Sequence, residues 1–203
     1  MTTATMKLGP ADHGRLISYE EFESAPWEEG YRYELIDGRL YVSPTPEAPH
    51  EFLVQWKLRH LNSYVDDRPE IINFACTGAR VHIPNQSRRT SVQPDIAAYR
   101  DFPRALLLRR RIIWRDLFPL LVAEIVSEDN PEKDLVRNIG LYLQVPSIRE
   151  YWIIDPRDDY TRPTLTVYRR RGASWQRPIE LASGETYTTK LLPGFSPLLD
   201  PLA

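Results

Sequence analysis

Two carboxylates stand inside largely apolar, strand-like sequence, and they constrain the fold of this chain more than any other feature. Asp95 lies within residues 92–99, among small and β-branched residues, and Glu124 lies within residues 120–127. An unpaired carboxylate in such surroundings is costly to desolvate, so each acid needs a cation beside it. Two partners are open at this point: a divalent metal ion held by both acids, or a buried ion pair with one of the nearby arginines.

A helix and a further strand follow the second acid. Pro131 fits the first position of a helix predicted over residues 131–145, where a missing N–H costs nothing, and Asp129 or Asn130 precedes it as the cap. Residues 149–155 are predicted as a strand, and their apolar run indicates a covered position in a sheet.

The N-terminal part carries two clear local signals. Ser18 and Glu21 have the spacing of a capping box that opens a short helix ending near residue 26. Residues 31–36 and 39–43 alternate around Asp37-Gly38, which is the strongest short-range signal for a β-hairpin.

The remaining elements complete a mixed pattern. Helical spacing predicts a helix of about four turns between His50 and residue 66. Residues 102–118 fit either a short helix or an arginine-rich strand. Further strands are predicted at residues 71–75, 79–83, 165–168, 175–180 and 187–191. This order predicts an α/β fold of the α+β type, with helices packed on a mixed β-sheet.

Length and composition favour one domain. The chain has 203 residues and 42% hydrophobic content, enough for a sizeable core, and we expect a flexible segment at 1–16 followed by a single domain at 17–203. The single cysteine, Cys76, excludes an internal disulfide framework and favours the reducing cytoplasm. No apolar run reaches the roughly 18 residues of a membrane span, so no membrane association is expected.

Positive charge is concentrated in one region. Between Arg80 and Arg115 there are nine arginines, no lysine and two acids, a local balance of 9 − 2 = +7 in a chain whose net charge is −2. Such segregation can focus potential on an anionic ligand, and Arg80, Arg88 and Arg89 are candidate nucleic-acid contacts. The alternative is an ordinary loop whose charges face water.

The two acids and this basic region together favour phosphodiester chemistry. Hard divalent cations such as Mg²⁺ or Mn²⁺ prefer oxygen ligands, so Asp95 and Glu124 are predicted as the metal ligands. Glu34 can add a third carboxylate, or it can be a surface acid or the partner of Arg32 or Arg39. A metal held in this way activates water and neutralises charge on a phosphate.

Several short blocks, taken in order, resemble the Uma-type restriction endonuclease family of the PD-(D/E)XK nuclease superfamily. The blocks are Tyr33-Glu-Leu-Ile-Asp-Gly-Arg-Leu40, Ser43-Pro44 followed by His50, Gln93-Pro-Asp-Ile96, Val122-Ala-Glu-Ile-Val-Ser127 and Arg149-Glu-Tyr-Trp-Ile-Ile-Asp-Pro156. The resemblance covers roughly residues 18–168. It implies a restriction-endonuclease-like core on a curved mixed sheet, Mg²⁺-dependent cleavage of nucleic acid, with DNA expected, and a homodimer.

The resemblance also assigns roles. Asp95 matches the aspartate of the motif, Glu124 its second acid, Glu34 the acid of the first element and His50 a loop histidine. For His50 the alternative is a cap on the helix that it precedes.

The motif lysine is missing. It would stand two residues after Glu124, where this chain has Val126, and the position to which the family's lysine migrates aligns with Asn138. Asparagine cannot supply a positive charge, so Lys133, one helical turn earlier, is the acid–base candidate, with Arg137 as a supporting cation. The alternative for Lys133 is a plain solvated lysine.

Two functions follow: a metal-dependent endonuclease, or a catalytically impaired nuclease-fold protein that binds nucleic acid or protein.

Overall fold

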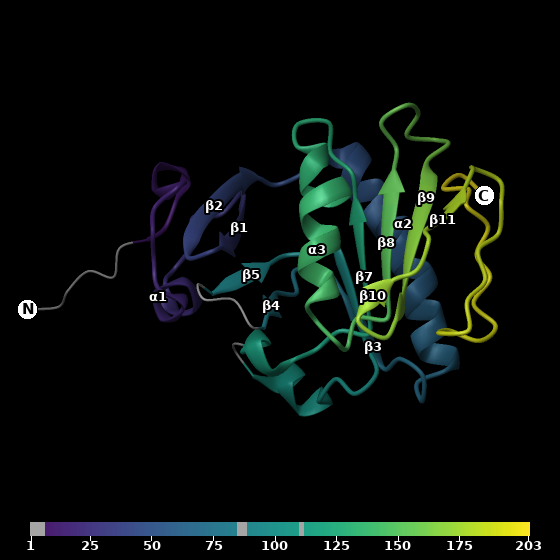
Figure 1. Ribbon diagram of the computed structural model, residues 1–203, viewed down its shortest axis with the longest axis horizontal. Coiled ribbons are helices and arrows are strands. Elements are labelled where there is room, and N and C mark those ends of the chain that lie inside the picture. Colours follow the sequence, from purple (N-terminus) through teal and green to yellow (C-terminus); the bar gives the residue numbers. More distant parts are fainter. Residues whose placement is uncertain (1–6, 85–88, 110–111) are drawn as a thin grey trace, which may run out of the picture.

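The computed structural model describes residues 7–84, 89–109 and 112–203, which form two β-sheets with helices around the larger one (Figure 1). The strands are β1 Tyr31–Ile36, β2 Arg39–Pro44, β3 Phe74–Cys76, β4 Val81–Ile83, β5 Thr90–Val92, β6 Ile96–Tyr99, β7 Leu121–Ile125, β8 Glu150–Asp155, β9 Thr164–Arg171, β10 Ser174–Trp175 and β11 Ile179–Leu181. The α-helices are α1 Tyr19–Ser24, α2 Ala48–Asp67 and α3 Asn138–Leu143.

The larger sheet is mixed, as the sequence predicts. Its order is β10-β9-β8-β7-β6-β3, with β11 also paired to β9. β7 and β8 are parallel, because the helical segment that ends in α3 carries the chain back between them, and the other neighbours are antiparallel. The smaller sheet has the order β2-β1-β5-β4.

Helices cover both faces of the larger sheet. The alternation of β7 sends Leu121, Ala123 and Ile125 toward α2 and Val122 toward α3. Glu124 shares the face of Val122, so its carboxylate is directed at α3. Among the described residues no helix is both long and apolar enough to cross a membrane.

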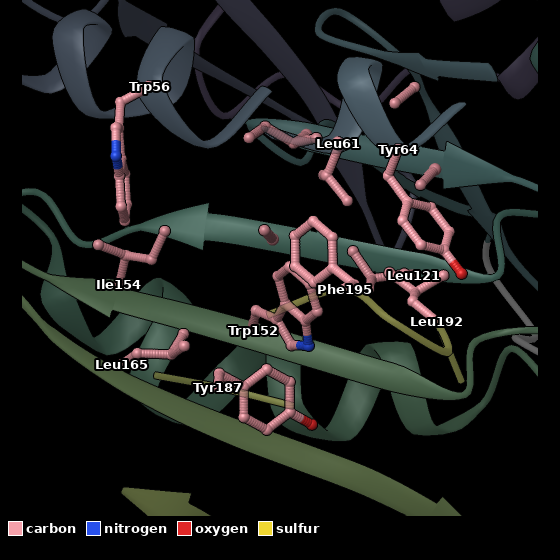
Figure 2. Packing of buried hydrophobic residues seen from close by; sticks show 14 of the residues in the cluster. Trp56, Leu61, Tyr64, Leu121, Trp152, Ile154, Leu165, Tyr187, Leu192 and Phe195 are labelled. Carbon is pink, nitrogen blue, oxygen red and sulfur yellow. The ribbon is translucent and has the colours of Figure 1, made fainter. Parts of the chain in front are cut away.

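The C-terminal segment completes the α2 face of the sheet (Figure 2). Phe195 stacks on Trp152 with ring centroids 5.7 Å apart, and Tyr187 meets Trp152 edge-on at 5.7 Å. The strand predicted at residues 187–191 does not form. This stretch is irregular, and its side chains pack into the core without backbone pairing to the sheet.

Other local predictions are confirmed or corrected. The hairpin turns at Asp37 and Gly38, both with positive φ, and Ser18 accepts from the N–H of Glu21 as the helix cap. Part of the N-terminal segment expected to be flexible is packed: Leu8 is buried against Trp27 and Tyr33, while residues 1–6 lie outside the described residues.

Two further stretches match the predictions in part. Residues 102–118 contain the short 3₁₀ helices Arg104–Leu108 and Trp114–Asp116 and, where described, no strand, which agrees with the short-helix alternative. The strands predicted at 71–75 and 79–83 are shorter and belong to different sheets.

Glu150 anchors the C-terminal segment to β8. Its buried carboxylate accepts from the indole N–H of Trp152 at 2.8 Å, from Tyr187 Oη at 3.2 Å and from Thr189 Oγ1. Glu150→Gln places an amide N–H₂ group against these donors and removes the charge, so we expect a loss of about 1–2 kcal/mol in the free energy of unfolding, measured in urea. Glu180→Gln on exposed β11 is the control; equal loss in both variants would contradict the anchor.

Candidate metal and nuclease site

Asp95 lies where the chain passes from the smaller sheet to the larger one. β5 ends at Val92 and β6 begins at Ile96, so the one strand expected over residues 92–99 is two strands in two sheets. Pro94, which cannot donate to a ladder, falls at the break.

The register of β6 on β7 brings Asp95 beside Glu124. Ile96 pairs with Ala123. The N–H of Asp95 donates to Oε2 of Glu124 at 3.1 Å, and the N–H of Ile125 donates to Oδ2 of Asp95 at 2.8 Å. The two acids therefore lie side by side at the ends of adjacent strands, as the sequence predicts.

Arg32 supplies the cation at Asp95. Its Nη1 lies 2.5 Å from Oδ1 of Asp95, whose side chain is fully buried. Within the described residues no second donor bonds Oδ1. Burial acts to raise the pKa of Asp95, but His50 and Arg32 outweigh it and hold the pKa well below its usual range.

His50 lies in the first turn of α2 and contacts the other oxygen of Asp95. Its Nε2 is 3.3 Å from Oδ2 of Asp95 and 3.2 Å from the carbonyl oxygen of Ile125. Both partners are acceptors, so this geometry assigns the proton to Nε2. The helix cap is Glu47, without a side-chain bond, so His50 orients Asp95 instead of capping α2.

Glu124 is buried and held by α3. Its Oε1 accepts from Tyr142 Oη at 2.6 Å and from Asn138 Nδ2 at 3.0 Å, and its Oε2 lies 3.8 Å from Lys133 Nζ. Burial raises the pKa of Glu124 to about 7, with the neighbouring charge of Asp95 acting in the same direction.

Glu34 pairs with Arg137 and not with Arg32 or Arg39, the two arginines of its own hairpin. Nη2 of Arg137 donates to Oε2 of Glu34 at 2.7 Å, and the N–H of Gln93 donates to Oε1 at 3.2 Å. Burial acts against ionisation, but Arg137 and Lys133 lower the pKa of Glu34. Each of the three predicted acids thus has its own cation.

A π-helical turn, Lys133–Arg137, precedes α3 and sets these positions. The N–H of Asn138 donates to the carbonyl of Lys133, five residues earlier. Lys133 Nζ lies 3.2 Å from Oδ1 of buried Asp134, which also accepts from Asn138 at 3.1 Å. Burial raises the pKa of Asp134 to about 8. π-turns inside helices occur frequently at functional sites.

Lys133 is therefore no ordinary surface lysine. Its side chain is 18% exposed. Burial acts to lower its pKa, but Glu124 and Asp134 outweigh it and raise the pKa above its usual value. The two carboxylates favour the ammonium form of Lys133, which suits electrostatic stabilisation more than accepting a proton.

A pocket of about 620 Å³ opens in front of the acids. Its wall includes Arg32, Glu34, His50, Gln93 and Lys133, while the fully buried side chains of Asp95 and Glu124 lie behind these residues.

Two of the arginines predicted to contact nucleic acid, Arg80 and Arg89, do not line this pocket. Arg80 stacks on Trp27 at 4.3 Å and lines a different hollow, with Arg109 and Arg115. Arg89 pairs with Glu20 at 2.6 Å. Arg88 lies outside the described residues. Contact of these arginines with nucleic acid stays a prediction.

The donor set suits Mg²⁺ or Mn²⁺ in its chemistry. Two carboxylates with waters are a usual set for Mg²⁺, and Oδ1 of Asp95 is a buried oxygen that, among the described residues, meets no donor besides Arg32. Within the described residues, no three His, Cys, Asp or Glu side chains gather closely enough to hold an ion by themselves. A metal here would rest on Asp95 and Glu124 and on water.

Three residues of the site carried no clear sequence signal. Arg32 entered only as a partner for Glu34, and no site role was predicted for Tyr142 or Asp134. All three act through contacts between distant segments or through the π-turn, which the sequence pattern does not indicate.

Comparison with known proteins supports one family. The model of the family Uma2, described as "Putative restriction endonuclease", matches residues 19–202. The chain is similar to the crystal structure of a "putative nuclease belonging to DUF820" from Anabaena variabilis, with a TM-score of 0.65 and 23% identity over 91% of this chain and 95% of that one. No protein of curated function matches it. Because the family model spans nearly the whole chain, the protein belongs to the Uma2 family.

Proposed function

We propose that this protein is a Mg²⁺- or Mn²⁺-dependent endonuclease that hydrolyses phosphodiester bonds of nucleic acid, with DNA as the expected substrate. The observation that carries the proposal is the placement of Asp95 and Glu124 side by side, behind a pocket that also holds the ammonium of Lys133. Family membership supports the same chemistry.

Each residue of the site would have a distinct role in this reaction. Asp95 and Glu124 would hold the metal, which supplies Lewis acidity and a water of lowered pKa. His50 keeps Oδ2 of Asp95 occupied and so directs Oδ1 toward the cation. Lys133 places positive charge beside Glu124, where it would stabilise charge developing on the phosphate. Glu34 holds Arg137.

A second candidate rests on one specific observation. Each acid is already neutralised by a protein cation, through the pairs Asp95–Arg32, Glu124–Lys133 and Glu34–Arg137. Such pairing gives each of the three acids a cation from the protein itself, which suits a nuclease-fold protein that binds nucleic acid or protein without turnover. The homodimer stays a prediction under both candidates.

Calorimetric titration of Mg²⁺ and Mn²⁺ separates the two. Wild type is expected to bind, and Asp95→Asn and Glu124→Gln to lose binding while their melting curves show a folded protein, because each removes one anionic ligand. Glu128→Ala, which removes an exposed acid at the same pocket, is the matched control. Absence of binding to wild type at millimolar metal, with an oligonucleotide present, would overturn the metal-dependent proposal and leave the second candidate.

A further inference from the structure

Arg32 connects the open pocket to the buried acid. It belongs to β1, where Arg32 and Glu34 are two residues apart and project from the same face toward the site. The Arg32 side chain is 18% exposed, whereas that of Asp95 is fully buried. The guanidinium therefore lies between solvent in the pocket and the Asp95 carboxylate.

Arg32 contacts the oxygen that a metal would need. Oδ2 of Asp95 is occupied by the N–H of Ile125 and by His50 Nε2. Only Oδ1 is left for a cation among the described contacts, and Arg32 Nη1 lies 2.5 Å from it. A divalent ion and a guanidinium cannot share this oxygen, because like charges a few ångströms apart in a buried site repel strongly.

The Arg32 contact is also placed so that it can open. Within the described residues no second donor bonds Oδ1 of Asp95, whereas both oxygens of Glu34 are held, one by Arg137 at 2.7 Å and the other by the N–H of Gln93 at 3.2 Å. Arg32 lines a pocket of about 620 Å³, so its guanidinium has open space to enter when it leaves Asp95.

We propose that Arg32 is the internal counter-ion of the metal site: it neutralises Asp95 Oδ1 in the metal-free protein and is exchanged for the divalent cation. This inference rests on the metal site proposed above and adds a positioning residue to it. The exchange explains how a fully buried carboxylate stays ionised without metal. Its consequence is that Arg32 lowers the affinity for metal, since binding requires the ion pair to break.

Calorimetric titration of Mn²⁺ into Arg32→Gln tests the exchange. We expect this variant to bind Mn²⁺ about tenfold or more tightly than wild type, because no cation competes for Oδ1. Arg137→Gln removes the same charge from the neighbouring Glu34 pair but leaves the Asp95 pair, so its affinity should change by about threefold at most. Arg32→Gln binding no more tightly than wild type would overturn the exchange while leaving the metal site intact.

A measurement on wild type covers the case in which Arg32→Gln does not fold. The arginine Nε–H resonance of Arg32, assigned by comparison with Arg32→Lys, is expected to shift on Mg²⁺ addition as the guanidinium leaves Asp95. Mg²⁺ binding seen by calorimetry without any change in this resonance would overturn the inference. No binding by either wild type or Arg32→Gln would overturn both the exchange and the metal site.

Discussion

Lys133→Met is expected to lower the rate of phosphodiester cleavage by about 10²–10³-fold, because it removes the cation nearest to Glu124 from a largely buried site. Lys133→Arg keeps the charge and should retain much more of the rate. The measurement is single-turnover cleavage of an oligonucleotide at saturating enzyme and saturating Mn²⁺, so that differences in substrate binding and metal binding do not enter. Lys190→Met, which removes an exposed lysine, is the control.

Asn138→Lys in the Lys133→Met background tests whether a lysine at position 138 can replace the positive charge of Lys133. Asn138 Nδ2 already lies 3.0 Å from Oε1 of Glu124, so a lysine at this position is within reach of the same carboxylate. The double variant should recover about tenfold of the lost rate. Cleavage by Lys133→Met at the wild-type rate would contradict a catalytic Lys133, and a wild type without cleavage would favour the binding-protein candidate.

The sequence predicts those parts of this site that depend on local pattern. The Asp37-Gly38 turn, the long helix that begins near His50 and the neighbouring strands of Asp95 and Glu124 are all confirmed, because turn chemistry and apolar runs are local properties. The break before β6 was not predicted, although Pro94, which cannot continue a ladder, marks it.

The charge pairing was not predictable in the same way. Arg32 meets Asp95, and Arg137 meets Glu34, only because β1 and the π-turn are brought together in the fold. The open alternative was an ion pair with one of the arginines near Asp95 in sequence, but Arg80 contacts Trp27 and Arg89 pairs with Glu20. Ion-pair partners depend on tertiary arrangement, so nearness in sequence is a poor guide to them.

Lys57 provides the second large expected effect, on stability. This α2 residue is 1% exposed, and its Nζ lies 4.4 Å from the ring centroid of Trp56 and 5.4 Å from that of Trp152. No ion pair to Lys57 is found among the described residues. Burial lowers its pKa to about 7, although the two indole rings favour the charged form.

Lys57→Met should therefore raise the free energy of unfolding by about 4 kcal/mol at pH 7, because the folded protein no longer holds a lysine whose pKa lies so far below its unfolded value. Between about pH 7 and pH 10.5 the unfolded wild type binds a proton that the folded protein lacks, so wild-type stability rises with pH across this window. The advantage of Lys57→Met should shrink accordingly. Urea unfolding at several pH values measures this, with Lys190→Met as the control; a gain independent of pH, or a less stable variant, would show that Lys57 carries no buried-charge penalty.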